Sequence, residues 1–175
     1  MKWLRYLNGI LLAGFVWFAV SLWPHLPDRI PRHFGANGEV DAWVERSLGS
    51  WFALPAIAVF TVAVLEFSAW LVERRPQYIN LPSKQQFLAL PPHEQAPIAR
   101  EVGIFVQGLA TMMILVFATI QWATYQAARG ISTRALMQFV LVATLLVGPI
   151  LAVVMIARTS SQVEAARRRV KLRGG

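Results

Sequence analysis

Two groups of side chains in this chain of 175 residues are of types that could do chemistry. The first group lies in the short polar segment 24–50 and consists of His25, His33, Glu39 and Asp41. Imidazole and carboxylate groups are ligands for zinc or manganese, which would make this segment a metal site. The spacing forms neither an HxH pair nor an HExxH helix. Because alternation along two strands puts His33 and Asp41 on opposite faces, we predict no metal ion and no cofactor here.

The second group lies inside long apolar runs and consists of Asn8, Glu66 and Gln107. At a rise of about 1.5 Å per residue, Glu66 and Gln107 fall at one depth, about 9 Å below the same surface, and Asn8 lies close to that level. A carboxylate in a bilayer costs at least about 2.5–3.5 kcal/mol, so we expect Glu66 to face neighbouring helices. Glu66 is then either a structural acid, hydrogen-bonded to Gln107, or the proton or cation site of a transporter.

The sequence contains no recognisable catalytic constellation. It has no cysteine, which excludes disulfides and thiolate metal sites. A glycine-rich phosphate loop, a nucleophile elbow and a Cys/His pair are also missing. We therefore name no catalytic residue, and an enzyme is the alternative to a non-enzymatic function.

Four apolar runs must position these groups. They cover residues 7–23, 51–72, 102–125 and 135–157. Each is close to the roughly 20 residues that cross a hydrocarbon core of about 30 Å, and 56% of all residues are hydrophobic. We therefore predict an all-α integral membrane protein, a single domain over 1–175 with four transmembrane helices. The first run is longer than the roughly 7–15 residues of a signal-peptide core, so we expect an uncleaved anchor.

The net charge of +8 is unevenly distributed along the chain. Twelve Lys and Arg residues lie before the first run, in the loop 73–101 and in the tail 158–175, whereas five lie in the other two connections. Under the positive-inside rule, both termini are cytoplasmic and the segment 24–50 is outside. This topology explains the excess charge without nucleic acid. In the tail, apolar residues recur at helical spacing among the basic ones. We therefore expect the tail to form a helix along the membrane surface that binds anionic lipid.

The segment 24–50 also has the pattern of a small β-hairpin. The runs 30–34 and 39–44 flank Gly35-Ala36-Asn37-Gly38, and Asn-Gly between short runs is a strong hairpin signal. A two-residue and a four-residue turn are both compatible, and both give the same two faces. One face carries Ile30, Arg32, Phe34, Glu39, Asp41 and Trp43, and the other carries His33, Val40, Ala42 and Val44. We expect Arg32 beside Asp41 or Trp43, and His33 turned towards the helix ends.

Other local patterns predict helix ends and a kink. Ser47 or Ser50 can cap the second transmembrane helix. The stretch 83–90 can form one or two turns of helix at the membrane surface. Gly148-Pro149 should kink the fourth helix near its middle.

One pattern in the hairpin segment resembles a known family. Its residues are Leu26, Pro27, Ile30, Pro31, His33, Phe34, Gly38, Asp41 and Trp43. In this order they resemble the bacterial membrane "domain of unknown function" shared with the N-terminal part of SdpI-type immunity and signalling proteins. The chain departs from the pattern at Val40, where proline is usual, and at 44–46, where a Gly-Ser-Lys-like end is usual. The resemblance covers this segment and the helix on each side of it.

The resemblance implies a multi-pass protein of the bacterial cytoplasmic (inner) membrane with a shaped outer loop. The motif residues, together with Arg32, would bind an extracytoplasmic peptide or protein partner, in sensing of or immunity to a secreted peptide. The protein would contact the lipid bilayer. Whether it forms a homo-oligomer is left open. The alternative function is a small membrane transporter or a membrane-embedded enzyme that uses Glu66 or the loop histidines.

Overall fold

The computed structural model describes residues 2–173, and for Lys2 and Arg173 it describes the backbone alone. The predicted basic tail therefore lies within the described residues except for the Arg173 side chain and residues 174–175. The elements in chain order are α1 (Lys2–Leu22), the 3-10 turn η1 (Trp23–His25), β1 (Arg29–Phe34), β2 (Val40–Glu45), α2 (Leu48–Arg74), the 3-10 turn η2 (Pro76–Tyr78), α3 (Lys84–Leu88), α4 (Pro92–Ala128) and α5 (Arg134–Arg173).

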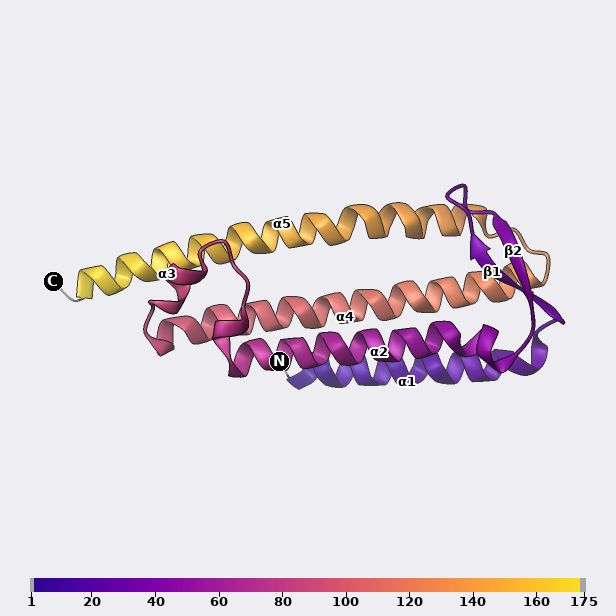
Figure 1. The fold of residues 1–175 in the computed structure, drawn as a ribbon, viewed down its shortest axis with the longest axis horizontal. Helices are drawn as coiled ribbons and strands as arrows, with labels where there is room; N and C mark the ends of the chain where they lie inside the picture. Colours follow the sequence, from indigo (N-terminus) through magenta and orange to yellow (C-terminus); the bar gives the residue numbers. More distant parts are fainter. Residues whose placement is uncertain (1, 174–175) are drawn as a thin grey trace.

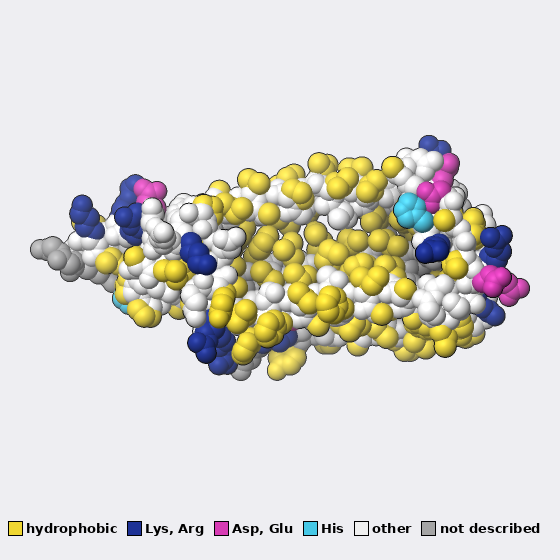
Figure 2. Space-filling model, viewed as in Figure 1, with side chains coloured by type: hydrophobic (Ala, Val, Ile, Leu, Met, Phe, Trp, Pro, Cys, Tyr) yellow, Lys and Arg dark blue, Asp and Glu magenta, His cyan; other side chains and the backbone are white. Residues whose placement is uncertain are grey.

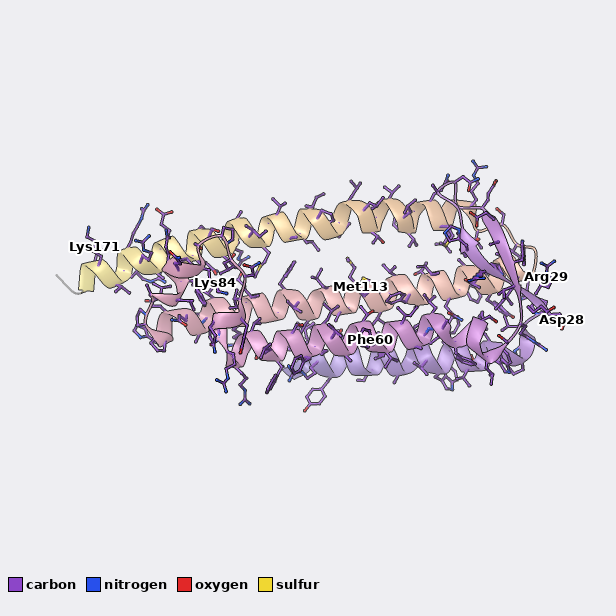
Figure 3. All side chains as sticks on the ribbon, viewed as in Figure 1. Asp28, Arg29, Phe60, Lys84, Met113 and Lys171 are labelled. Carbon is purple, nitrogen blue, oxygen red and sulfur yellow. The ribbon has the colours of Figure 1, made fainter. Side chains whose placement is uncertain are left out.

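Four helices, α1, α2, α4 and α5, are long and apolar enough to cross a membrane, judged by length and composition. They run lengthwise beside one another, with the β1–β2 hairpin at one end of the molecule, the hairpin end, and α3 at the other, the α3 end (Figure 1). Apolar side chains cover the middle, and charged side chains gather at the two ends (Figure 2). In Figure 3, Phe60 and Met113 lie at mid-length, Asp28 and Arg29 at the hairpin end, and Lys84 and Lys171 towards the α3 end. This distribution fits a multi-pass membrane protein.

The helices α1, α2 and α4 share a core at mid-length. Its buried residues are Phe15, Ala58, Val62, Ala110 and Ile114. The two alanines, both completely buried, have no side chain beyond Cβ and let the helix backbones approach closely. Nearer the hairpin end, Trp51 of α2 donates its indole Nε1–H to the Ala19 carbonyl of α1 at 2.9 Å. These contacts pack the three helices together as one bundle.

The fourth long helix, α5, is attached mainly near its two ends. In its described part the buried residues are Thr159, Val163 and Ala166, all towards the α3 end. Val163 and Ala166 belong to a second core with residues of α3, α4 and the connections on both sides of α3, namely Ile79, Leu81, Phe87, Leu90, Ile98 and Ala99. The most apolar stretch of α5 has no buried residue, and Figure 1 shows it set apart from α4 at mid-length.

One prediction about α5 is wrong, and another stays a prediction. The helix is continuous through Gly148-Pro149, and the kink expected there stays a prediction. The helix also continues past Arg158 along the same course (Figure 1), so no separate helix turns to lie along a membrane surface. The reason is packing: Val163 and Ala166, the apolar side of the expected surface helix, are completely buried against protein instead.

At its N-terminal end α2 is capped as predicted, because Ser47 and Ser50 form a reciprocal capping box.

The connection between α2 and α4 is more helical than its prolines suggest. After Pro76, which ends α2, the short helix α3 occupies the predicted place, although Ser83 makes no side-chain cap. The next helix, α4, begins at Pro92, ten residues before the apolar run at 102. Proline suits the first position of a helix, where its missing N–H is not needed.

The hairpin turn has an odd number of residues, unlike either predicted turn. The Gly35 N–H donates to the Glu39 carbonyl at 2.8 Å, and the Gly38 N–H donates to the Gly35 carbonyl at 2.8 Å. Gly38 has a φ of +76°, so a three-residue loop ends in a left-handed residue. A Cβ at Gly38 would also lie 2.5 Å from the Arg134 carbonyl oxygen of α5. Both its conformation and its close contact with α5 therefore require glycine.

The odd turn shifts the strand register by one residue, so the predicted faces are wrong. The strands are antiparallel, Ile30 pairs with Val44, and Pro31 pairs with Trp43. Ile30 is 1% exposed and Trp43 is 44% exposed, so the two residues that were expected on one face lie on opposite sides. The pairing is also irregular on both sides of His33. Such a bulge lets one strand hold an extra residue and redirects the side chains next to it.

Candidate functional site

The hairpin is fixed to the ends of α1, α2 and α4 by a small core. Leu26, Ile30, Trp51 and Tyr125 are buried together beneath it. Arg46, just after β2, donates from its guanidinium to the Leu26 carbonyl at 2.6 Å and lies over the Trp23 ring at 5.5 Å. An isolated two-stranded sheet is marginal in water. These contacts explain how so short a hairpin keeps a defined position on the helix ends.

His33 and Asp41 form the main polar contact of the hairpin. His33 Nδ1 lies 2.7 Å from Asp41 Oδ1, and the two side chains are 67% and 52% exposed. The prediction that these residues point to opposite faces is therefore wrong. The bulge at His33 is the cause, because it removes the strict alternation on which that prediction depended. Among the described residues, Arg32 forms neither the ion pair with Asp41 nor the stacked contact with Trp43 that the sequence suggested. Within the described part of the chain, Arg32 makes no hydrogen bond and no ion pair.

A cavity of about 560 Å³ lies beneath the hairpin, between it and the ends of α2, α4 and α5. Consecutive motif residues of β1, Pro31 to Phe34, form one side of it. The helices contribute mostly apolar side chains together with Ser50, Gln121 and Thr124. Gln121 is 2% exposed, and its side chain donates one long hydrogen bond of 3.4 Å to the Trp51 carbonyl. Sequence reasoning singled out the β1 residues and considered Ser50 as a cap alone, but it missed Gln121 and Thr124, which have no distinctive spacing.

The motif residues thus divide into supporting and exposed ones. Ile30 is buried beneath the hairpin, Phe34 lines the cavity, and Gly38 packs on α5. Pro27 is exposed but directly follows the buried Leu26, where it restricts the chain that enters the hairpin. The exposed set consists of Arg32, His33, Asp41 and Trp43.

The intramembrane polar residues come together between α1, α2 and α4. Asn8 Nδ2 donates to Glu66 Oε1 at 2.7 Å, and Gln107 Nε2 donates to Glu66 Oε2 at 3.2 Å. The hydrogen bond predicted between Glu66 and Gln107 is present. Arg5 adds an ion pair from its Nε to Glu66 Oε2 at 3.2 Å. Thr111 closes the cluster by donating to Asn8 Oδ1 at 2.6 Å.

This polar cluster connects three helices with its charges balanced. Glu66 accepts three hydrogen bonds, and the Arg5 guanidinium offsets its negative charge. Arg5 and Thr111 were missed by sequence reasoning. Their spacing contained the signal: Arg5 precedes Asn8 by three residues and Thr111 follows Gln107 by four, which places each pair on one helix face.

The four residues considered as metal ligands do not converge. His25 Nδ1 lies 3.3 Å from the Ser21 carbonyl, and Glu39 forms an ion pair with Arg134 at 3.2 Å. Among residues 2–173, no group of three or more His, Asp or Glu side chains could hold a metal ion.

Comparisons with known proteins find relatives without an assigned activity. Residues 9–59 match a family described as a domain of unknown function, DUF1648. This part comprises most of α1, the hairpin and the first turns of α2. An uncharacterised protein of Archaeoglobus fulgidus is 34% identical over 86 residues, which are 47% of this chain and 46% of the relative. The chain therefore spans about half the length of this curated relative. No solved structure matches.

These matches support one level of the predicted resemblance. The resemblance to a domain of unknown function is confirmed for residues 9–59. The finer resemblance, to SdpI-type immunity and signalling proteins, stays a prediction.

Proposed function

We propose that this chain is a multi-pass protein of the bacterial cytoplasmic membrane that senses an extracytoplasmic peptide at the exposed side of its hairpin. The observation that carries the proposal is the arrangement of the motif. Its apolar residues fix the hairpin to the helix ends, which leaves the His33–Asp41 pair and Trp43 exposed. Aromatic and charged side chains on a fixed support are the usual anchors of a protein–peptide contact. SdpI-type immunity is the functional analogy that we propose for such a site.

The distribution of basic residues supports one orientation of the protein. Those at the α3 end and in the tail outnumber those at the hairpin end, twelve to five over the whole sequence. The positive-inside rule then supports a cytoplasmic α3 end and an external hairpin. The peptide would approach from outside the cell.

The helix α5 gives the hairpin a route to the cytoplasmic side. At the hairpin end, Arg134 Nη1 of α5 forms an ion pair with Glu39 Oε1 at 3.2 Å. At the α3 end, Arg169 Nη2 forms an ion pair with Glu94 Oε2 of α4 at 2.8 Å, and Arg158 forms another with Glu101. One continuous helix connects these two ends. A displaced hairpin would therefore move α5 relative to α4, which supports sensing with a cytoplasmic response.

The transporter alternative has less support from the Glu66 cluster. A proton or cation site needs a carboxylate whose charge can change or be shared with the ion. Glu66 instead has a guanidinium partner and two amide donors. This arrangement suits a structural link between helices.

A survival assay tests the proposal. Cells that express the chain, or an empty vector, are challenged with a purified secreted killing peptide of the class that SdpI-type proteins counter. We expect better survival with the wild-type chain and loss of that protection with Trp43→Ala. Trp17→Ala is the matched control, because Trp17 is 70% exposed on the apolar side of α1, away from the hairpin.

Two outcomes would contradict the proposal. Protection that survives Trp43→Ala and His33→Ala, at equal protein levels, would show that the exposed hairpin residues bind nothing. Protection that is lost with Glu66→Gln while the hairpin variants are silent would favour the transporter.

A further inference from the structure

Two cavities lie one after the other along α4 and α5, and we call the two together the cleft. The hairpin cavity has Ile120, Gln121 and Thr124 of α4 and Met137 of α5 in its wall. The second, smaller cavity of about 200 Å³ lies between the α4 stretch 112–119 and the α5 stretch 139–147, and its Thr119 is next to Ile120 in the sequence. From Thr124 to Met112 the distance along α4 is about 18 Å. Figure 2 shows this side of the molecule hollowed, with apolar side chains on the floor.

The lower part of the cleft suits an alkyl chain better than a peptide. Of the residues that line it, only Thr119 and Thr144 carry polar side-chain atoms. Thr119 already donates to the Leu115 carbonyl of its own helix at 2.8 Å. A peptide backbone there would leave its N–H and C=O groups almost without partners, which is costly away from water. A hydrocarbon chain has no such groups to satisfy.

The upper part of the cleft carries an unneutralised positive charge. Arg32 lines the hairpin cavity, and no acidic side chain does so among the described residues. The two nearby acids of the hairpin are engaged elsewhere, Asp41 with His33 and Glu39 with Arg134. An unpaired guanidinium in a concave, largely apolar site favours an anionic group, and its planar donor set matches a phosphate.

We propose that the seam between α4 and α5 binds one anionic phospholipid, with its phosphate at Arg32 and one acyl chain in the cleft towards Val147. The buried Gln121 amide lies in the same cavity wall and has a second N–H for an ester oxygen of the lipid, whereas the Thr124 hydroxyl already donates to the Ile120 carbonyl at 2.9 Å. The inference rests on the membrane placement proposed above, and the two sites share His33, which lines the cavity and also pairs with Asp41. Arg32→Gln tests the lipid and Trp43→Ala tests the peptide, so the two proposals can fail separately.

Lipid titration by native mass spectrometry tests the head-group contact. The full chain, purified in detergent and stripped of lipid, is titrated with phosphatidylglycerol or with phosphatidylcholine of the same acyl chains. We expect one tight phosphatidylglycerol and a preference over phosphatidylcholine of about tenfold. Arg32→Gln should remove that preference. Arg29→Gln is the matched control, because Arg29 lies on the same strand, is exposed and lines none of the cavities described (Figure 3).

A second pair of variants and a photo-crosslink test the acyl-chain contact. Ala143→Phe fills the cleft and should weaken lipid binding, whereas Val142→Phe, at a position of α5 that does not line the cleft, should not. If Ala143→Phe does not fold, the wild-type protein still gives the answer. A phosphatidylglycerol with a diazirine near the chain end should crosslink to the stretches 112–119 and 139–147.

Several results would overturn the proposal. Equal losses with Arg32→Gln and Arg29→Gln would show a general effect of charge. Crosslinks spread evenly over the exposed apolar residues would show only surrounding bilayer lipid. If inorganic phosphate competes as well as the lipid does, the acyl chain has no role in binding. A retained peptide in place of lipid would make the lipid assignment wrong.

Discussion

Gly38 is the residue at which the hairpin tip contacts α5, and its lack of a side chain is needed for two separate reasons. Gly38→Ala would adopt an unfavourable positive φ and would also bring a Cβ to 2.5 Å from the Arg134 carbonyl oxygen. Gly130→Ala is a matched control, because Gly130 has a φ of +78° but open space around it. We expect Gly130→Ala to cost about 1–2 kcal/mol and Gly38→Ala clearly more. Thermal unfolding in detergent measures the difference, and equal losses would show that the hairpin moves away from α5 without cost.

Glu66 provides a second prediction for a single residue. Glu66→Gln removes the charge that Arg5 faces while it keeps one acceptor oxygen for Asn8 or Gln107. We expect a loss of about 1–2 kcal/mol of stability, at the low side for a charged hydrogen bond because Arg5 is half exposed. The double variant Arg5→Met with Glu66→Gln should recover part of the loss, because no unpaired charge remains. A double-mutant cycle by thermal unfolding checks this, and strictly additive losses would contradict the ion pair.

The polar contacts of the Glu66 cluster were largely predictable, whereas those of the hairpin were not. Depth along two helices places Glu66 and Gln107 together, because helix rise is constant. The His33–Asp41 contact depends on a bulge and on an odd turn. Two-, three- and four-residue turns are all compatible with the same residues, and the three-residue turn that forms also packs Gly38 against Arg134, 96 residues later in the chain, a contact that no local pattern indicates.

Among the elements, α5 depends on the small core at the α3 end. Val163→Ser would place a hydroxyl in a site that is completely buried. We expect a loss of about 1–3 kcal/mol and easier proteolysis in the η2–α3 connection, because the same core holds Ile79 and Leu81 in place. Val170→Ser on the same helix is the control, since Val170 is 38% exposed. Limited proteolysis with fragment mapping measures the effect, and identical patterns for the two variants would show that this core does not hold the connection.

The existence of the long helices followed from the sequence, but two of their bounds did not. Apolar runs mark where a helix would cross hydrocarbon, and four of them were identified. α4 starts ten residues before its run, at Pro92, and α5 continues well beyond the apolar run that ends at 157. These extensions pack against each other and against α3, so long-range contacts rather than local composition determine them.

For the whole molecule, the orientation in the membrane can be measured directly because the chain has no cysteine. Asn37→Cys is exposed at the hairpin tip, and Gln85→Cys is exposed on α3. In intact cells a membrane-impermeant maleimide should label position 37 and not position 85. After permeabilisation both should react. Labelling of position 85 alone in intact cells would show the opposite orientation, and the hairpin could then not bind a peptide from outside.

The contact between Gly38 and the Arg134 carbonyl also means that the hairpin can reach its final packing only after α5 is in place. The carbonyl that the hairpin tip contacts belongs to Arg134, which is synthesised 96 residues after Gly38. Until α5 is inserted, the strands lack this contact and are held by the small core on α1, α2 and α4 and by Arg46. The part that matches the domain of unknown function, residues 9–59, contains the hairpin but not Arg134. Any protein that shares that part alone must supply its own surface for the tip of the hairpin.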